Sequence, residues 1–172
     1  MEYYILLTIL VLGAGIIYGV YLTITTVSEK SLEKQRLEIR SKHIDITLPI
    51  RLQAYERMCL FLERISPNNL LLRLVPTAGN ALELQQLLLN DIREEYNHNV
   101  AQQMYMSNNA WDQINNAMNE IVADINNASV EVTPESPAAD LAKKVFSNVI
   151  QKEVQPTVHA LKVLKEEVRQ IF

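Results

Sequence analysis

The sequence is poor in glycine, cysteine and aromatic residues. Only four of its 172 residues are Gly, and Gly79 is the only one beyond position 19, which argues against an all-β domain with many tight turns. Cys59 is the single cysteine, so no internal disulfide can form. It lies in an apolar stretch, and we interpret it as a small core residue rather than a nucleophile. Leu, Ala, Glu, Gln and Lys are common, which favours helices.

Basic residues are nearly absent from the middle of the chain. Between Arg73 and Lys143 there is one, Arg93, against ten acidic residues. Residues 28–73 hold nine Lys and Arg against six acids, and the segment from Lys143 onward holds six against three. The outer segments could pair with the acidic one inside a single bundle, which we favour, or the acidic face could meet a basic partner. Lys and Arg are interleaved with carboxylates everywhere, so we expect no nucleic-acid partner.

Charge is absent altogether from residues 3–28. About twenty apolar residues cross the hydrocarbon core of a bilayer, so the segment 1–28 is predicted to be a transmembrane anchor in contact with membrane lipid. A cleaved signal peptide would need a basic start, but Glu2 precedes the run, and no small-residue cleavage site closes it. Basic residues follow it closely, which predicts an outside N-terminus and a cytoplasmic domain on a singly crossed inner membrane. These residues are Lys30, Lys34, Arg36, Arg40 and Lys42.

Gly15 and Gly19 form a G-x-x-x-G pair within the uncharged run. Small residues at this spacing let two helix backbones approach closely inside a membrane. We therefore expect these two glycines to pack against another helix. The partner would be a second copy, joined through this helix and the charged helical stalk at 29–47, or another protein.

Residues 48–172 predict an all-α bundle of roughly four main helices. Pro49 suits the first turn of the first helix, because its missing N–H would be unpaired there. Ser66-Pro67 predicts a cap followed by Pro at the first position of a short apolar helix. Asn80 and Glu83 have the spacing of a capping box, which would open the next helix.

Three further segments show helical periodicity. A helix at about 81–105 carries an apolar stripe that runs from Leu84 to Met104, and Ser107 is a suitable N-cap for a heptad-patterned helix at 111–128. The final helix begins at Ser136-Pro137, after a loop at 131–137. Pro156 falls inside this last helix and predicts a kink or short break, since it removes one backbone hydrogen bond.

Catalytic signatures are missing. Glu95 and His98 have the spacing of a metal-binding pair on one helix face, but a di-iron bundle needs a second such pair, which the sequence does not supply. We interpret them as surface residues. No phosphate-binding glycine loop, Cys/His cluster or Ser/His/Asp order can be assembled. We therefore expect no enzymatic activity, no bound metal and no cofactor.

Two polar segments are candidate interaction surfaces. The first is the acidic stretch around Asp91, Glu94 and Glu95. The second is the Asn-rich face of the heptad helix, which includes Asn115 and Asn116 and offers amide donors, although an ordinary solvated face is the simpler interpretation.

Long blocks of this chain resemble an uncharacterised bacterial family of short, single-pass, all-helical proteins. They are LPIRLQAYERMCLFLERISPNNLLLRL (48–74), REEYNHNVAQQMYMSNNAWDQI (93–114) and LKEEVRQIF (164–172). The resemblance covers most of the chain and implies the same anchored helical architecture. It implies no activity, cofactor or site.

The sequence therefore predicts a non-enzymatic, membrane-anchored scaffold or accessory subunit that mediates protein–protein interaction on the cytoplasmic face. The alternative is a membrane-tethered sensor or regulator that binds a small apolar ligand or lipid in the bundle core. Met58, Met104 and Met118 would give that core an adaptable lining.

Overall fold

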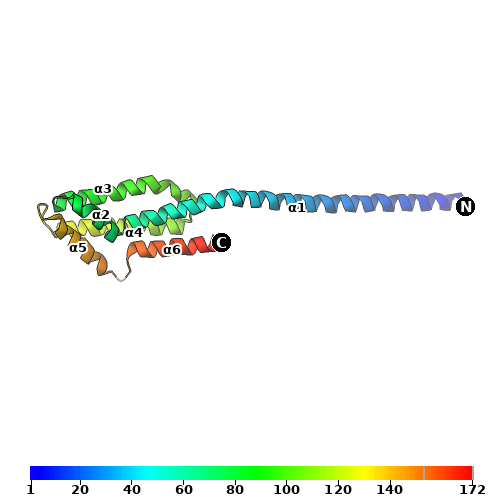
Figure 1. Ribbon diagram of the computed structural model, residues 1–172. Coiled ribbons are helices and arrows are strands. Elements are labelled where there is room, and N and C mark those ends of the chain that lie inside the picture. The colour runs from blue at the N-terminus through cyan, green and yellow to red at the C-terminus, as the bar shows by residue number, and fades with distance from the viewer. Residues whose placement is uncertain (153, 172) are drawn as a thin grey trace. The chain divides into compact units, whose positions relative to one another are not determined.

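The computed structural model describes the backbone of residues 1–152 and 154–171 (Figure 1). Within the helices it leaves undescribed the side chains of residues 4, 6–9, 11, 26–29, 31–32, 40 and 43. Every regular element in the described part of the chain is a helix, which confirms the all-α class. The chain divides into two compact units, the N-terminal unit (Met1–Leu48) and the bundle unit (Pro49–Phe172), and each is described by itself.

Helix α1 (Glu2–Arg64) contains Pro49 in its interior, so the prediction that Pro49 begins a new helix is wrong. Proline fixes φ near the helical value, and its main cost inside a helix is one lost hydrogen bond together with crowding of the preceding turn. The helix continues past Pro49, and three of the following residues are buried in the bundle core: Tyr55, Met58 and Phe61. Such tertiary packing is the main source of helix stability in proteins and outweighs the local penalty.

The next helices begin where their sequence signals place them. Helix α2 (Pro67–Leu74) has Pro at its first position, as predicted, but the Ser66 hydroxyl donates to the Glu63 carbonyl at 2.7 Å and does not cap the helix. The chain continues through the short helix η1 (Val75–Thr77) to α3 (Ala81–Asn99). The Asn80 side chain accepts a hydrogen bond from the Glu83 backbone N–H at 2.9 Å, and Glu83 Oε2 accepts one from the Gly79 N–H at 2.8 Å. The predicted capping at this start is confirmed, with Gly79 as the reciprocal donor.

Helix α3 is shorter than the predicted helix at 81–105, because residues 100–105 form the 3₁₀ helix η2 (Val100–Tyr105). A 3₁₀ helix has three residues per turn, so the apolar stripe loses its register there. Leu84, Leu88 and Ile92 are buried, whereas Met104 is 81% exposed. The expected core position of Met104 is therefore wrong.

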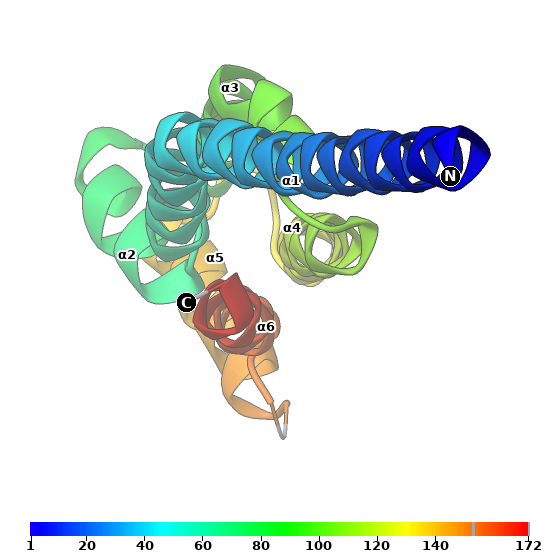
Figure 2. The same ribbon diagram turned by 90° about the vertical axis from the view of Figure 1, so that its right-hand side faces the viewer.

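Helices α4 (Asn108–Val130), α5 (Ala138–Ile150) and α6 (Pro156–Ile171) complete the bundle unit. Ser107 caps α4 by accepting the Ala110 N–H at 3.1 Å, as predicted. Pro156 marks a full break, since α6 begins at this residue, and α5 begins one residue after Pro137 rather than at it. Figure 2 shows α4 beside α6, and these two helices pack along each other.

The core of the bundle unit is a single apolar cluster to which all six α-helices contribute. The loop at 131–137 closes one end, where its carbonyls at Ser136 and Pro134 accept the Ala81 and Leu82 N–H groups at 2.8 and 3.1 Å. These bonds satisfy N–H groups that the first turn of α3 cannot pair. Large, fully buried members of the cluster are Phe61, Met58, Leu62, Ile65, Leu70, Leu84, Leu88, Ile92, Ile114, Ile121, Ile125 and Leu141.

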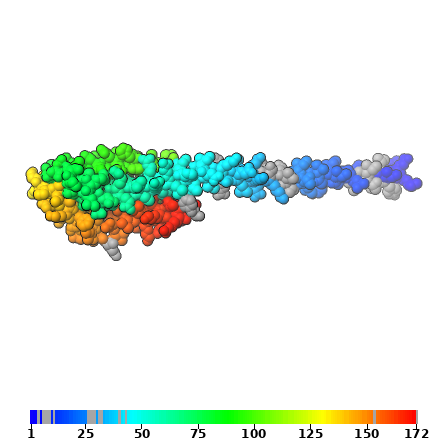
Figure 3. All heavy atoms as spheres, in the orientation of Figure 1, coloured from blue at the N-terminus to red at the C-terminus, as the bar shows by residue number. Residues whose placement is uncertain are grey.

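The N-terminal unit consists of the first part of α1, and its described side chains form the surface that Figure 3 shows from one side. Among the described residues, no helix has a stretch both apolar and long enough to qualify as a membrane span. The predicted span at 3–28 includes side chains outside the described set, at 4, 6–9, 11 and 26–28, and Arg40 also lies outside it.

Candidate functional site

The acidic stretch on α3 pairs largely with arginines of its own chain. Arg73 donates two hydrogen bonds to Asp91, from Nη1 to Oδ1 and from Nη2 to Oδ2, each at 2.7 Å. The hydrogen bond to Asp91 raises the pKa of the Arg73 guanidinium, although burial opposes this. Arg64 lies 2.6 Å from Glu95. The charge asymmetry of the sequence is thus used inside the bundle, as the first of its two explanations proposed.

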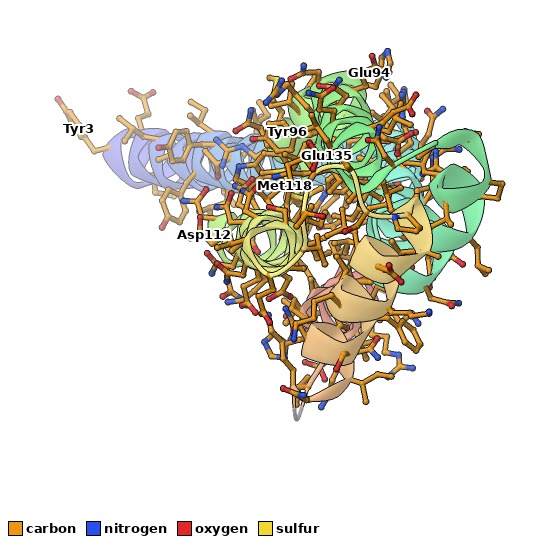
Figure 4. The ribbon with its side chains drawn as sticks, turned by 90° about the vertical axis from the view of Figure 1, so that its left-hand side faces the viewer. Tyr3, Glu94, Tyr96, Asp112, Met118 and Glu135 are labelled. Atoms are coloured by element: carbon orange, nitrogen blue, oxygen red, sulfur yellow. The ribbon has the colours of Figure 1, made fainter. Side chains whose placement is uncertain are left out.

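Glu94 is the one member of the predicted acidic surface that stays exposed and forms no ion pair with another described residue. Figure 4 shows it at the outer edge of the bundle unit, whereas Tyr96 and Met118 lie closer to its centre. Tyr96 stacks near Trp111 with ring centroids 5.9 Å apart. Of the three acidic residues, only Glu94 therefore offers a free carboxylate to a partner.

Asn115 and Asn116 lie on α4, where Asn115 is half-buried and Asn116 is exposed. Neither amide forms a hydrogen bond with another described side chain or backbone group. Both amides are therefore left to solvent or to a partner. The structure does not bring them together with Glu94, which belongs to α3.

The three methionines named as a possible ligand lining do not converge. Met58 is fully buried in the core, Met118 is half-buried, and Met104 is exposed on η2. None of them lines the grooves described below. The three methionines therefore do not line one shared cavity among the described residues, so they lend no support to the alternative of a ligand-binding core.

A polar junction that the sequence did not indicate joins three helices through the Glu167 carboxylate. Tyr55 of α1 donates its hydroxyl hydrogen to Glu167 Oε1 at 2.5 Å, and the Ser107 backbone N–H donates to the same oxygen at 2.8 Å. The Ser107 hydroxyl contacts Glu167 Oε2. Arg51 completes the junction, with Nη2 donating to the Tyr55 hydroxyl oxygen at 3.2 Å and Nε to the Tyr105 carbonyl at 3.1 Å. Of the residues in this junction, only Ser107 had a role that the local sequence predicted, as the N-cap of α4.

The junction shifts two pKa values in opposite directions. Burial alone would raise the pKa of the Glu167 carboxyl, but the hydrogen bonds from Ser107 and Tyr55 and the nearby Arg51 charge outweigh burial and lower that pKa. Burial and the hydrogen bond to Glu167 raise the pKa of the Tyr55 phenol. An ionised carboxylate facing a neutral phenol is therefore the favoured state near neutral pH.

A second polar cluster holds the connection between α5 and α6 against α4. Lys152 Nζ lies 2.8 Å from Asp124 Oδ2 and 3.2 Å from Glu120 Oε2. Asp124 is only 8% exposed, and its Oδ2 accepts no well-directed hydrogen bond, so the ion pair with Lys152 is what offsets the burial of this charge. Burial lowers the pKa of Lys152, but its contacts with the two carboxylates outweigh burial and raise it.

Among the described residues, three surface grooves stand out on the bundle unit. The first, of about 330 Å³, runs between α1 and α6 over Leu52, Cys59, Leu164 and Val168. The second, of about 380 Å³, is apolar and lies between α2 and α5, with Phe146 on its wall. The third, of about 440 Å³, adjoins the Glu167 junction.

The residues with catalytic or metal-binding types are dispersed. The Glu95 carboxylate forms an ion pair with Arg64, so it is half-buried inside the fold rather than a surface residue as predicted. No group of three or more His, Cys, Asp or Glu side chains suited to a metal ion occurs among the described residues. Cys59 is half-buried against the core, as predicted, and burial raises the pKa of its thiol.

In the N-terminal unit, Gly15 and Gly19 lie on the open surface of α1. A Cβ atom added at either glycine would meet no described atom within 4 Å. Within this unit, a second helix could therefore approach the backbone at both positions.

The fold and its polar contacts define an all-helical protein whose bundle unit is stabilised by charge pairs and by a half-buried carboxylate junction. A family model described as "Family of unknown function (DUF7935)" matches residues 1–171, so the chain belongs to this family. No curated protein and no solved structure matches the chain.

Proposed function

We propose that this protein is a non-enzymatic, membrane-anchored interaction module, acting as a scaffold or as an accessory subunit of a larger complex. Its N-terminal helix would cross the membrane once, and its bundle unit would present an interaction surface at the cytoplasmic face. The proposal is supported by the chemistry of the N-terminal unit and by the polar contacts of the bundle unit, which are structural in kind.

The observation that carries the anchor is a set of exposed apolar side chains on the described part of the N-terminal helix. The consecutive residues Ile16, Ile17 and Tyr18 are 67%, 72% and 64% exposed. Neighbouring residues of an α-helix point about 100° apart, so these three cover most of its circumference. A helix that is apolar all round is stable in water only when it is covered, and a bilayer covers it completely. The uncharged run at 3–28 has the length that such a covering requires.

The orientation follows from the flanking charges. Lys30, Lys34 and Lys42 follow the uncharged run, whereas Glu2 is the only charged side chain before it. Positive residues beside a span tend to stay in the cytoplasm, which supports the proposed cytoplasmic bundle unit and outside N-terminus.

Self-association through Gly15 and Gly19 is testable by substitution. Replacing both with Leu should remove crosslinks between anchors of two copies at least in large part, because the added side chains keep the helix backbones apart. Gly13→Leu is the matched control, since residue 13 points about 200° away from residue 15. Equal crosslinking of both variants and the wild type in membranes would contradict this role of the pair.

The proposed role is tested by crosslinking the tagged full chain in cells, capturing it and identifying its neighbours by mass spectrometry. A stoichiometric membrane partner would make the protein an accessory subunit, whereas crosslinks between copies alone would make it a homo-oligomeric scaffold. A lone monomer with no crosslinked neighbour would contradict the proposal.

A further inference from the structure

The groove between α1 and α6 has walls of opposite charge. On the α1 side stands Glu56, with Glu63 two turns further along the same face. On the α6 side stand Lys165 and Arg169, which are one turn apart. All four side chains are exposed, and none of them forms an ion pair with another described residue.

The floor between these walls is apolar. Leu164 is fully buried beneath it, and Leu52, Cys59 and Val168 are half-buried along it. Tyr55 also lines the groove, and its hydroxyl donates a hydrogen bond to Glu167. The groove therefore lies directly beside the Glu167 junction. The floor therefore belongs to a region that the junction holds in place.

An exposed apolar side chain stands beside the acidic wall. Leu60 is 55% exposed and lies one helical turn after Glu56. Val158, also exposed, lies about two turns before Lys165 on the corresponding side of α6. Each rim thus combines an apolar side chain with unpaired charge, which is the composition of an interface with an apolar centre and a polar edge.

We propose that this groove is the contact surface for a second copy of the chain, related by a two-fold axis. In such a contact the same patch is used twice, so a patch with one acidic and one basic wall is complementary to itself. Glu56 of each copy faces Lys165 of the other, with Arg169 one turn further along the same wall. Leu60 of each copy covers apolar floor of the other, which removes that floor from water. This inference rests on the proposed role as an interaction module and names its partner and surface.

The two-fold arrangement predicts an unusual response to charge reversal. In a pair of Glu56→Lys chains, both contacts bring like charges together, and the same holds for a pair of Lys165→Glu/Arg169→Glu chains. When one chain of each kind is combined, both contacts become attractive again. Only a contact that uses both walls of the same groove gives this pattern.

The test is co-capture of two differently tagged full-length copies expressed together in membranes, with Gly15→Leu/Gly19→Leu in every chain so that the anchors do not hold the copies together. Each charge-reversed variant paired with itself should show about tenfold less co-capture than the chain with an unchanged groove, and the mixed pair should return to near that level. Glu135→Lys, an exposed reversal in the loop at 131–137, is the control and should change nothing. Recovery in the mixed pair also shows that both variants are folded.

Two outcomes would overturn the inference. Undiminished co-capture of the self-paired variants would show that the groove faces solvent or another molecule, and loss without recovery in the mixed pair would exclude the two-fold contact. If either occurs while neighbours are still crosslinked to the wild type in cells, the interaction-module proposal stands and only the groove contact fails.

Discussion

Replacing Phe61 with Ala is expected to lower the free energy of unfolding of the bundle unit by about 3–5 kcal/mol. Phe61 is 1% exposed, and its ring lies 6.3 Å from that of Tyr96 between centroids. The substitution removes most of a large apolar side chain and leaves a cavity among helices that cannot fully close it. Denaturant unfolding followed by far-ultraviolet circular dichroism measures the loss.

Leu72→Ala is the matched control for this substitution. Leu72 lies on α2 and is 71% exposed, so its truncation should cost less than about 1 kcal/mol. Equal losses for the two variants would contradict the placement of this α1 face in the core.

Replacing Glu167 with Gln is expected to cost about 1.5–3 kcal/mol near neutral pH, because it removes the charge that accepts hydrogen bonds from Tyr55 and Ser107. Glu166→Gln is the control. Glu166 is exposed, and its one ion pair is a long contact of 3.9 Å with Lys162. Replacing Glu166 should therefore lower the free energy of unfolding by less than about 0.5 kcal/mol.

The effect of Glu167→Gln should also depend on pH. The pKa of Glu167 is lowered in the folded protein from an ordinary value of 4.5, so the carboxylate contributes stability above that value and loses it as pH falls through the folded pKa. The difference in unfolding free energy between wild type and variant should therefore be constant near neutral pH and shrink below about pH 4.5. A difference that grows on acidification would contradict the assigned direction of the shift.

The sequence predicted helix ends correctly where the contacts that form them join residues close together in the chain. The capping at Asn80 and Glu83, the cap at Ser107 and the break at Pro156 all depend on residues within four positions of one another. Pro49 failed as a helix start because burial of the residues after it, a tertiary effect, decides whether the helix continues. Met104 failed because a switch to 3₁₀ geometry cannot be seen in an apolar periodicity.

The polar contacts could be foreseen only as a balance of charge. The excess of acids in the middle of the chain predicted pairing with the outer segments, and Arg73–Asp91 and Arg64–Glu95 are such pairs. Which arginine meets which carboxylate depends on how the helices pack. Glu167 lies 112 residues from Tyr55 and 60 from Ser107, and no sequence spacing relates residues so distant.

Alkaline carbonate extraction of membranes from cells that express the full chain tests most directly the proposed anchoring of this protein by its N-terminal helix. The wild type should stay in the membrane pellet, whereas Ile16→Arg/Ile17→Arg should move into the supernatant, because each Arg at the centre of a span costs about 2.5–3.5 kcal/mol. Leu37→Arg/Ile39→Arg, a matched change at exposed positions of the stalk, should stay in the pellet. Extraction of the wild type into the supernatant, or equal behaviour of the two double variants, would contradict the proposed anchoring.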